Sequence, residues 1–166
     1  GEKAQPAAAT ADDPPIQIWI NNDGRFLRGD RAKVHVRTED DGYLVVLHAD
    51  AEGHLRVLFP LDPGADQRIV RDKKYELKGR GGREAFIADD SSGHGTVIAA
   101  VSKSPFRVDG FARDGHWDTR ALSDQRLRDD QETGLLDLVR QMQPSGEQFV
   151  YSVATYVVSE QYARDR

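Results

Sequence analysis

DGYLVVLHADAEGHLRVLFP, residues 41–60, joins two apolar runs through a short polar segment that contains Gly53. Side chains alternate between the two faces of a strand, so the pairing register decides which of them share a face. If Ala49 faced His54, both faces would mix apolar and polar residues. If Asp50 faces His54 across a three-residue loop, one face is uniformly apolar: Tyr43, Val45, Leu47, Ala49, Leu55, Val57 and Phe59. We predict this second register, in which Gly53 supplies the left-handed residue of a turn-plus-bulge loop.

The same register places His48, Asp50 and His54 together on the outward face of the hairpin. Two imidazoles and a carboxylate are metal ligands, and nitrogen donors favour zinc or copper. A second interpretation needs no metal, because polar residues alternate on the solvent side of any half-buried ribbon. We expect a solvated hairpin end without a cofactor, and a metal site at these three residues is the alternative.

Short runs with period-two spacing recur along the rest of the chain and indicate a mainly β protein. They lie at about residues 16–21, 32–38, 67–70, 74–77, 84–89, 96–102 and 148–159. Glycine-rich turns such as GRGGR, residues 79–83, separate them. Strands and turns at this spacing are typical of an antiparallel sandwich or barrel.

The spacing becomes helical between about residues 121 and 143. Leu135, Leu138, Val139 and Met142 form one apolar stripe, and Pro144 ends the run. Thr133 is available as the N-cap, and three acids suit the positive end of the helix: Asp129, Asp130 and Glu132. We therefore predict a helical insertion at 105–146, before the last strand, that packs its stripe on the sandwich.

Length and composition limit the domain count and the class of protein. A chain of 166 residues with a net charge of −5 and 31% charged residues predicts one well-solvated domain. We assign that domain to residues 16–160, with a disordered tether at 1–15 and a tail at 161–166. The Pro/Ala/Asp-rich tether resembles segments that follow export or lipoprotein signals, so we expect an extracytoplasmic location: periplasmic, secreted or lipid-tethered.

Several function classes are disfavoured by the same composition. The chain has no cysteine, which excludes disulfides and thiolate chemistry. No basic stripe or phosphate-binding segment is visible, so we expect no nucleic-acid partner. No apolar run approaches the length of about 18 residues that a membrane span needs.

Four segments, taken in order, carry a resemblance to a known family: IQIWIN (16–21), FLRGDRAKVHV (26–36), the hairpin stretch (41–60) and GTVIAAVSKSPF (95–106). Together they resemble the bacterial domain of unknown function 4384 (DUF4384), over about residues 16–106. The specific features are Gly42-Tyr43, Gly53 and Leu58-Phe59-Pro60 at these intervals. The resemblance implies an immunoglobulin-like sandwich in envelope-associated or secreted proteins, often appended to proteases or kinases as a non-catalytic module. It supplies no catalytic residues.

Other motifs have structural interpretations that compete with the functional ones. In RGD, residues 28–30, Gly29 and Asp30 suit a tight turn better than integrin recognition. TEDDG, residues 38–42, lacks the alternating ligands of a calcium loop. SSGHGT, residues 91–96, lacks the orienting acid and the oxyanion hole of a hydrolase.

The two tryptophans, Trp19 and Trp117, are candidate partner contacts, because exposed tryptophan is frequent at interaction hot spots. Alternatively, the insertion covers Trp19, and Trp117 anchors the insertion's own core. The function we expect is therefore a non-catalytic module, not an enzyme, that binds a protein or ligand through a sheet edge or through the 105–146 insertion. The alternatives are the metal-binding domain and a structural spacer for a separate catalytic domain.

Overall fold

The hairpin adopts the predicted register. In the computed structural model, which describes residues 15–88, 92–123, 127 and 130–160, it consists of β5 (Gly42–Ala49) and β6 (Leu55–Phe59). Ala49 pairs with Leu55, and the Asp50 amide donates to the His54 carbonyl at 3.0 Å. Gly53 has a φ of 88°, as the three-residue loop requires. Residues 1–14 of the predicted tether, the tail at 161–166, and Asp129, one of the acids predicted at the start of the helix, lie outside the described residues.

β5 belongs to the largest sheet, here called the central sheet, whose strands follow the order β2-β13-β10-β5-β6. The other members are β2 (Arg25–Leu27), β10 (Gly93–Ser102) and β13 (Phe149–Ser159), and β7 (Arg68–Ile69) also pairs with β5. All pairs are antiparallel except β2 with β13. The sheet is therefore mixed where we predicted purely antiparallel strands, because the short η2 (Asn21–Gly24) carries the chain across to the far side of β13.

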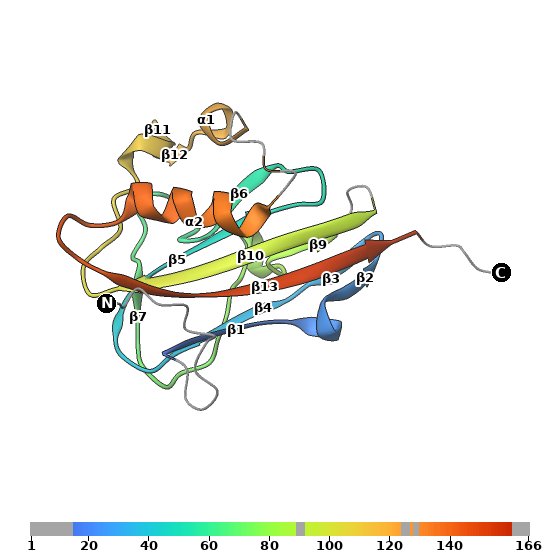
Figure 1. The fold of residues 1–166 in the computed structure, drawn as a ribbon, viewed down its shortest axis with the longest axis horizontal. Helices are drawn as coiled ribbons and strands as arrows, with labels where there is room; N and C mark the ends of the chain where they lie inside the picture. Colours follow the sequence, from blue (N-terminus) through green and yellow to red (C-terminus); the bar gives the residue numbers. More distant parts are fainter. Residues whose placement is uncertain (1–14, 89–91, 124–126, 128–129, 161–166) are drawn as a thin grey trace.

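A second layer covers one face of the central sheet. It contains β1 (Ile16–Ile20), β4 (Val34–Thr38) and β8 (Tyr75–Glu76), together with the pair β3 (Asp30–Ala32) and β9 (Phe86–Ala88). Figure 1 shows β1 and β4 on one side of β13 and β10, and helix α2 on the other. The first hydrophobic core fills the space between the layers, with residues such as Val36, Leu44 and Val97 fully buried.

The stretch between β10 and β13 covers the opposite face, as predicted for the insertion. It contains η4 (Asp109–Phe111), β11 (Ala112–Arg113), β12 (His116–Trp117), α1 (Thr119–Ser123) and α2 (Gln131–Met142). The predicted stripe packs into a second core with Val45, Leu47 and Ala49: Leu135, Leu138, Val139 and Met142. None of the helices in the described ranges has the length and apolar character needed to span a membrane.

The N-cap of α2 is Asp130, not Thr133. The Asp130 carboxylate accepts a hydrogen bond from the Thr133 backbone amide, 3.4 Å away. Thr133 therefore lies inside the first turn, and the predicted capping role of Asp130 is confirmed.

Both faces of β5 are buried over most of its length, which corrects one expectation. Leu44 and Val46, on the face opposite the predicted core side, are 1% and 0% exposed, and His48 on that face is 1% exposed. The prediction that His48 points to solvent is wrong, because the second layer covers the face that we expected to be open. Phe59 also changes sides: a register shift between Val46 and Leu47 sends it to the first core.

We expect Gly53→Ala to lower the free energy of unfolding by about 1–3 kcal/mol, because a residue with a side chain is strained at positive φ. An added Cβ would also lie 2.8 Å from the Leu127 carbonyl oxygen. Gly64→Ala is the matched control, since an added Cβ there meets no atom within 4 Å. Urea denaturation of the three proteins measures the difference, and equal loss in both variants would show that the loop does not depend on Gly53.

Candidate functional site

The three candidate metal ligands do not converge. Asp50 and His54 meet at the hairpin end, where Nδ1 of His54 lies 3.3 Å from the Asp50 carboxylate. The other Asp50 oxygen accepts from the backbone amides of Glu52 and His54, both at 2.9 Å, so this carboxylate holds the turn. His48 points instead into the first core. The described part of the chain contains no group of three His, Cys, Asp or Glu residues that could hold a metal.

His48 is part of a buried aromatic cluster with Phe86 and Tyr156. Its ring stacks on Phe86 with a centroid separation of 4.1 Å, and its Nε2 lies 2.7 Å from the Tyr156 hydroxyl oxygen. Burial, followed by the nearby charge of Arg56, lowers the pKa of His48 to about 3. His48 is therefore neutral at physiological pH, and its Nδ1 has no hydrogen-bond partner among the described residues.

Gly95 makes room for this cluster. It pairs with Tyr156 across β10 and β13, and a Cβ at position 95 would lie 2.1 Å from the Tyr156 ring. Because Gly95 has no side chain, the Tyr156 ring packs on the backbone of β10, and its hydroxyl lies within hydrogen-bond distance of His48. The cluster fixes the position of Phe86, whose strand continues into the pocket described next.

A hollow of about 590 Å³ lies at the surface between β6, the edge strand of the central sheet, and the β3–β9 pair of the second layer. In the described residues β6 pairs only with β5, and β9 pairs only with β3, so both strands are edges here. We call this hollow the arginine pocket. It is lined by Arg31 of β3, Arg56 of β6, Gly79, η3 (Arg80–Gly82), Arg83, Glu84, Ala85, and Phe86 and Ile87 of β9.

Two of the four arginines that line the arginine pocket have an acidic partner among the described residues. Arg31 forms an ion pair with Glu84 at 3.4 Å, and Arg80 donates to the Asp62 carboxylate. Within the part of the chain that the structure describes, the guanidinium groups of Arg56 and Arg83 have no ion pair or hydrogen bond. Two uncompensated cations therefore line the pocket of a protein whose net charge is −5.

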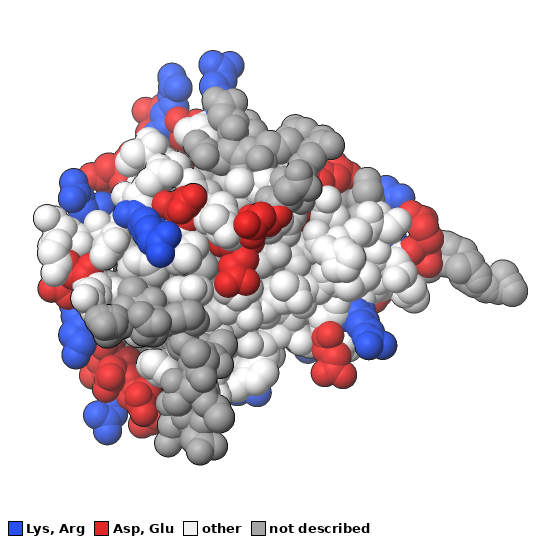
Figure 2. All heavy atoms as spheres, viewed as in Figure 1, with Lys and Arg blue, Asp and Glu red and all other residues white. Residues whose placement is uncertain are grey.

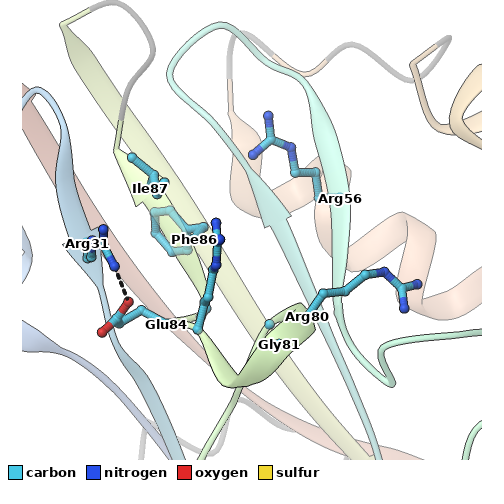
Figure 3. A pocket seen from close by; sticks show the side chains of 10 residues that line it. Arg31, Arg56, Arg80, Gly81, Glu84, Phe86 and Ile87 are labelled. Atoms are coloured by element: carbon cyan, nitrogen blue, oxygen red, sulfur yellow. Dashed lines mark hydrogen bonds and ion pairs between the residues drawn. The ribbon is translucent and has the colours of Figure 1, made fainter.

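The close view shows how these side chains are directed. Arg31 and Glu84 lie on one side of Phe86, and Arg56 lies on the other side (Figure 3). Arg80 is directed away from Phe86. The pKa of Glu84 is lowered, first by a backbone hydrogen bond and then by Arg31, so its carboxylate is ionised at neutral pH.

The arginine pocket differs from the surface seen in Figure 2. On that face Lys and Arg are interspersed with Asp and Glu, both around the margin and over the region of α2. Surface charges of mixed sign are the ordinary condition of a soluble protein. A concave site with four arginines against one carboxylate is therefore the strongest candidate for ligand binding.

The tryptophans have different environments. Trp19 on β1 is 38% exposed, with the Lys74 ammonium 5.1 Å from the ring centroid. Trp117 is half-buried against the second core, and its indole N–H donates to the carbonyls of Pro60 and Leu61 at 3.2 and 3.0 Å. Trp117 thus attaches the insertion to the loop that follows β6, and it packs on a core that the insertion shares with the central sheet and not on a separate core of the insertion.

The Gly29-Asp30 turn forms as predicted. Gly29 has a φ of 96°, and the Asp30 carboxylate accepts from the Leu27 amide at 2.8 Å. Asp30 also begins β3, which places the next residue, Arg31, at the arginine pocket. The RGD segment therefore has a structural role in positioning the pocket wall.

Sequence reasoning missed the arginine pocket. Its cations come from residues 31, 56, 80 and 83, on three separate elements and a connecting loop. Only GRGGR, with two arginines in a glycine-rich turn, gave a local signal, and we interpreted it as a turn alone. The sheet pairing that brings Arg56 opposite this turn is not encoded in any local pattern.

Comparison with known proteins identifies one family. The family model described as "Domain of unknown function (DUF4384)" matches residues 25–105, which confirms the resemblance derived from the sequence. All residues that line the arginine pocket fall within the matched range, and the insertion follows it. A search of curated proteins and a search of solved structures found no match.

We expect stability to fall with acidity because of His48. Once unfolded, His48 binds a proton near pH 6.5, whereas the folded state resists protonation down to about pH 3. The free energy of unfolding should therefore decrease by about 1.4 kcal/mol for each pH unit between roughly 6 and 4 from this residue alone. Urea denaturation at several pH values measures this slope, which His48→Gln should reduce.

His94→Gln is the control, because the His94 side chain is exposed. It should retain the slope of the unmodified protein. Identical slopes in the His48→Gln variant and the unmodified protein would contradict a neutral, buried His48.

Proposed function

We propose that this chain, which carries a DUF4384 domain at residues 25–105, is a non-catalytic recognition module that binds an anionic group of a partner molecule in the arginine pocket. The observation that carries the proposal is the pair of uncompensated guanidinium groups, Arg56 and Arg83, in a concave site of an acidic protein. Arginine forks form paired hydrogen bonds with oxyanions and remain charged at any physiological pH.

Electrostatics supports a binding role over a purely structural one. Like charges gathered at one place disfavour the folded state unless counter-charges accompany them, and among the residues that the structure describes only Arg31 and Arg80 of this pocket have such partners. An anionic ligand would supply the missing charge. Because both guanidinium groups are exposed, a ligand can reach them without opening the core.

The serine-containing loop gives no support to a catalytic alternative. Ser92 donates its hydroxyl hydrogen to Glu160 at 3.1 Å, and His94 is exposed on the following strand. Ser91 of the same motif lies outside the described residues. A hydrolase would need serine, histidine and an orienting acid in one hydrogen-bonded series, and we therefore propose recognition without chemistry.

We further propose an immunoglobulin-like sandwich at the bacterial envelope or in a secreted protein. Two packed β layers around the first core, and the family match, support the sandwich. The family resemblance and the tether-like composition of residues 1–15 support the location. Trp19, exposed on the outer layer, is a second candidate contact for a protein partner.

The proposal can be tested by capture from a bacterial envelope extract on immobilised protein. Each charge-assisted hydrogen bond contributes about 1.5–3 kcal/mol, so we expect the double variant Arg56→Gln, Arg83→Gln to weaken capture at least about a hundredfold. Arg25→Gln removes one exposed charge from β2, at the opposite edge of the central sheet, and should leave capture almost unchanged.

Capture that survives the loss of both arginines would contradict the proposed site and would direct attention to Trp19 or the insertion. Recovery of the captured molecule in a covalently altered form would contradict the non-catalytic role. Mass spectrometry of the eluted molecule distinguishes these results.

A further inference from the structure

We propose that the anionic group bound in the arginine pocket is a phosphate monoester, a tetrahedral dianion with three terminal oxygens. This inference rests on the proposed function and specifies its ligand. Three properties of the pocket support it: the number of uncompensated charges, the directions from which the arginines approach, and the apolar wall beside them.

Charge balance favours a dianion. Arg31 is paired with Glu84 and Arg80 with Asp62, which leaves Arg56 and Arg83 as the uncompensated cations of the pocket. A phosphate monoester carries a charge of about −1.5 to −2 at pH 7 and so balances both. A single carboxylate would balance only one of these two cations.

The approach directions favour a tetrahedral group. Arg56 extends from β6 (Figure 3), whereas Arg83 belongs to the loop between η3 and β9, so the two uncompensated arginines come from separate walls of the pocket. A carboxylate has two oxygens in one plane, which suits a single guanidinium fork. A phosphate has three terminal oxygens directed differently, so it can accept hydrogen bonds from arginines on separate walls.

The apolar wall of the pocket can contact the carbon portion of a phosphate ester. Ala85, Phe86 and Ile87 line it, and Ile87 is 42% exposed. The volume of about 590 Å³ exceeds what a bare phosphate needs and lies in the range of small-molecule sites. An ester whose carbon portion contacts Ile87 should therefore bind more tightly than inorganic phosphate.

Isothermal titration calorimetry with small anions tests the inference without the unidentified partner. The probes are inorganic phosphate, phosphoserine, glycerol 3-phosphate, phenyl phosphate, acetate and benzoate. We expect each phosphate ester to bind at least about tenfold more tightly than acetate or benzoate. Preference for phosphoserine would indicate a phosphorylated protein, preference for glycerol 3-phosphate would indicate a small phosphorylated polyol, and each supports the phosphate-monoester chemistry.

Single variants identify the groups responsible. Arg56→Gln and Arg83→Gln should each weaken phenyl phosphate binding about tenfold or more, whereas Arg25→Gln should change it less than twofold. The Nε–H signals of the arginines, followed by NMR, should shift on titration for the pocket residues and not for Arg25. Urea denaturation verifies that each variant is folded.

Two results would overturn the inference, and they separate it from the proposed function. If acetate or benzoate binds as tightly as the phosphate esters through Arg56 and Arg83, the pocket recognises anions but has no preference for phosphate. If no probe binds and capture from extract is still arginine-dependent, the inference fails while the proposed function remains. If capture is also independent of both arginines, both fail.

Discussion

The burial of both faces of the central sheet is the constraint on which the rest of the structure depends. Val45, Leu47 and Ala49 contribute to the second core, while Leu44 and Val46 on the same strand contribute to the first. A strand of this kind cannot be stable with only one covering layer, because its other face would expose a row of apolar side chains. The chain therefore needs the second β layer on one side and α2 with its neighbouring elements on the other.

This constraint makes the insertion an integral part of the fold. The match to the DUF4384 family ends at residue 105, before α2, yet α2 buries Leu135, Val139 and Met142 against the strands that the family model includes. One backbone hydrogen bond, from the Leu127 N–H to the Gly53 carbonyl at 2.8 Å, connects the hairpin loop to the segment that precedes this helix. The hairpin and the insertion thus stabilise each other across the second core.

Local patterns in the sequence were sufficient to predict the register of the hairpin loop and the apolar stripe of α2. Gly53 and the alternating apolar residues specify a turn and a face, and both depend only on neighbours along the chain. The burial of His48 could not be predicted in this way, because alternation distinguishes two faces without indicating that both are covered. The arginine pocket was missed for a related reason: Arg31, Arg56 and Arg83 meet only through the pairing and stacking of strands far apart in sequence.

The buried cluster and the arginine pocket form one continuous arrangement. Phe86 has its ring against neutral His48, whose Nε2 lies at hydrogen-bond distance from the Tyr156 hydroxyl, and the same residue lines the pocket. Core packing holds Phe86 in place, so the pocket wall that β9 forms keeps a constant position. The exposed arginine side chains can adjust to a ligand. Arg56 lines the pocket and also pairs with His48 across β5 and β6, so its positive charge adds to burial in lowering the pKa of His48.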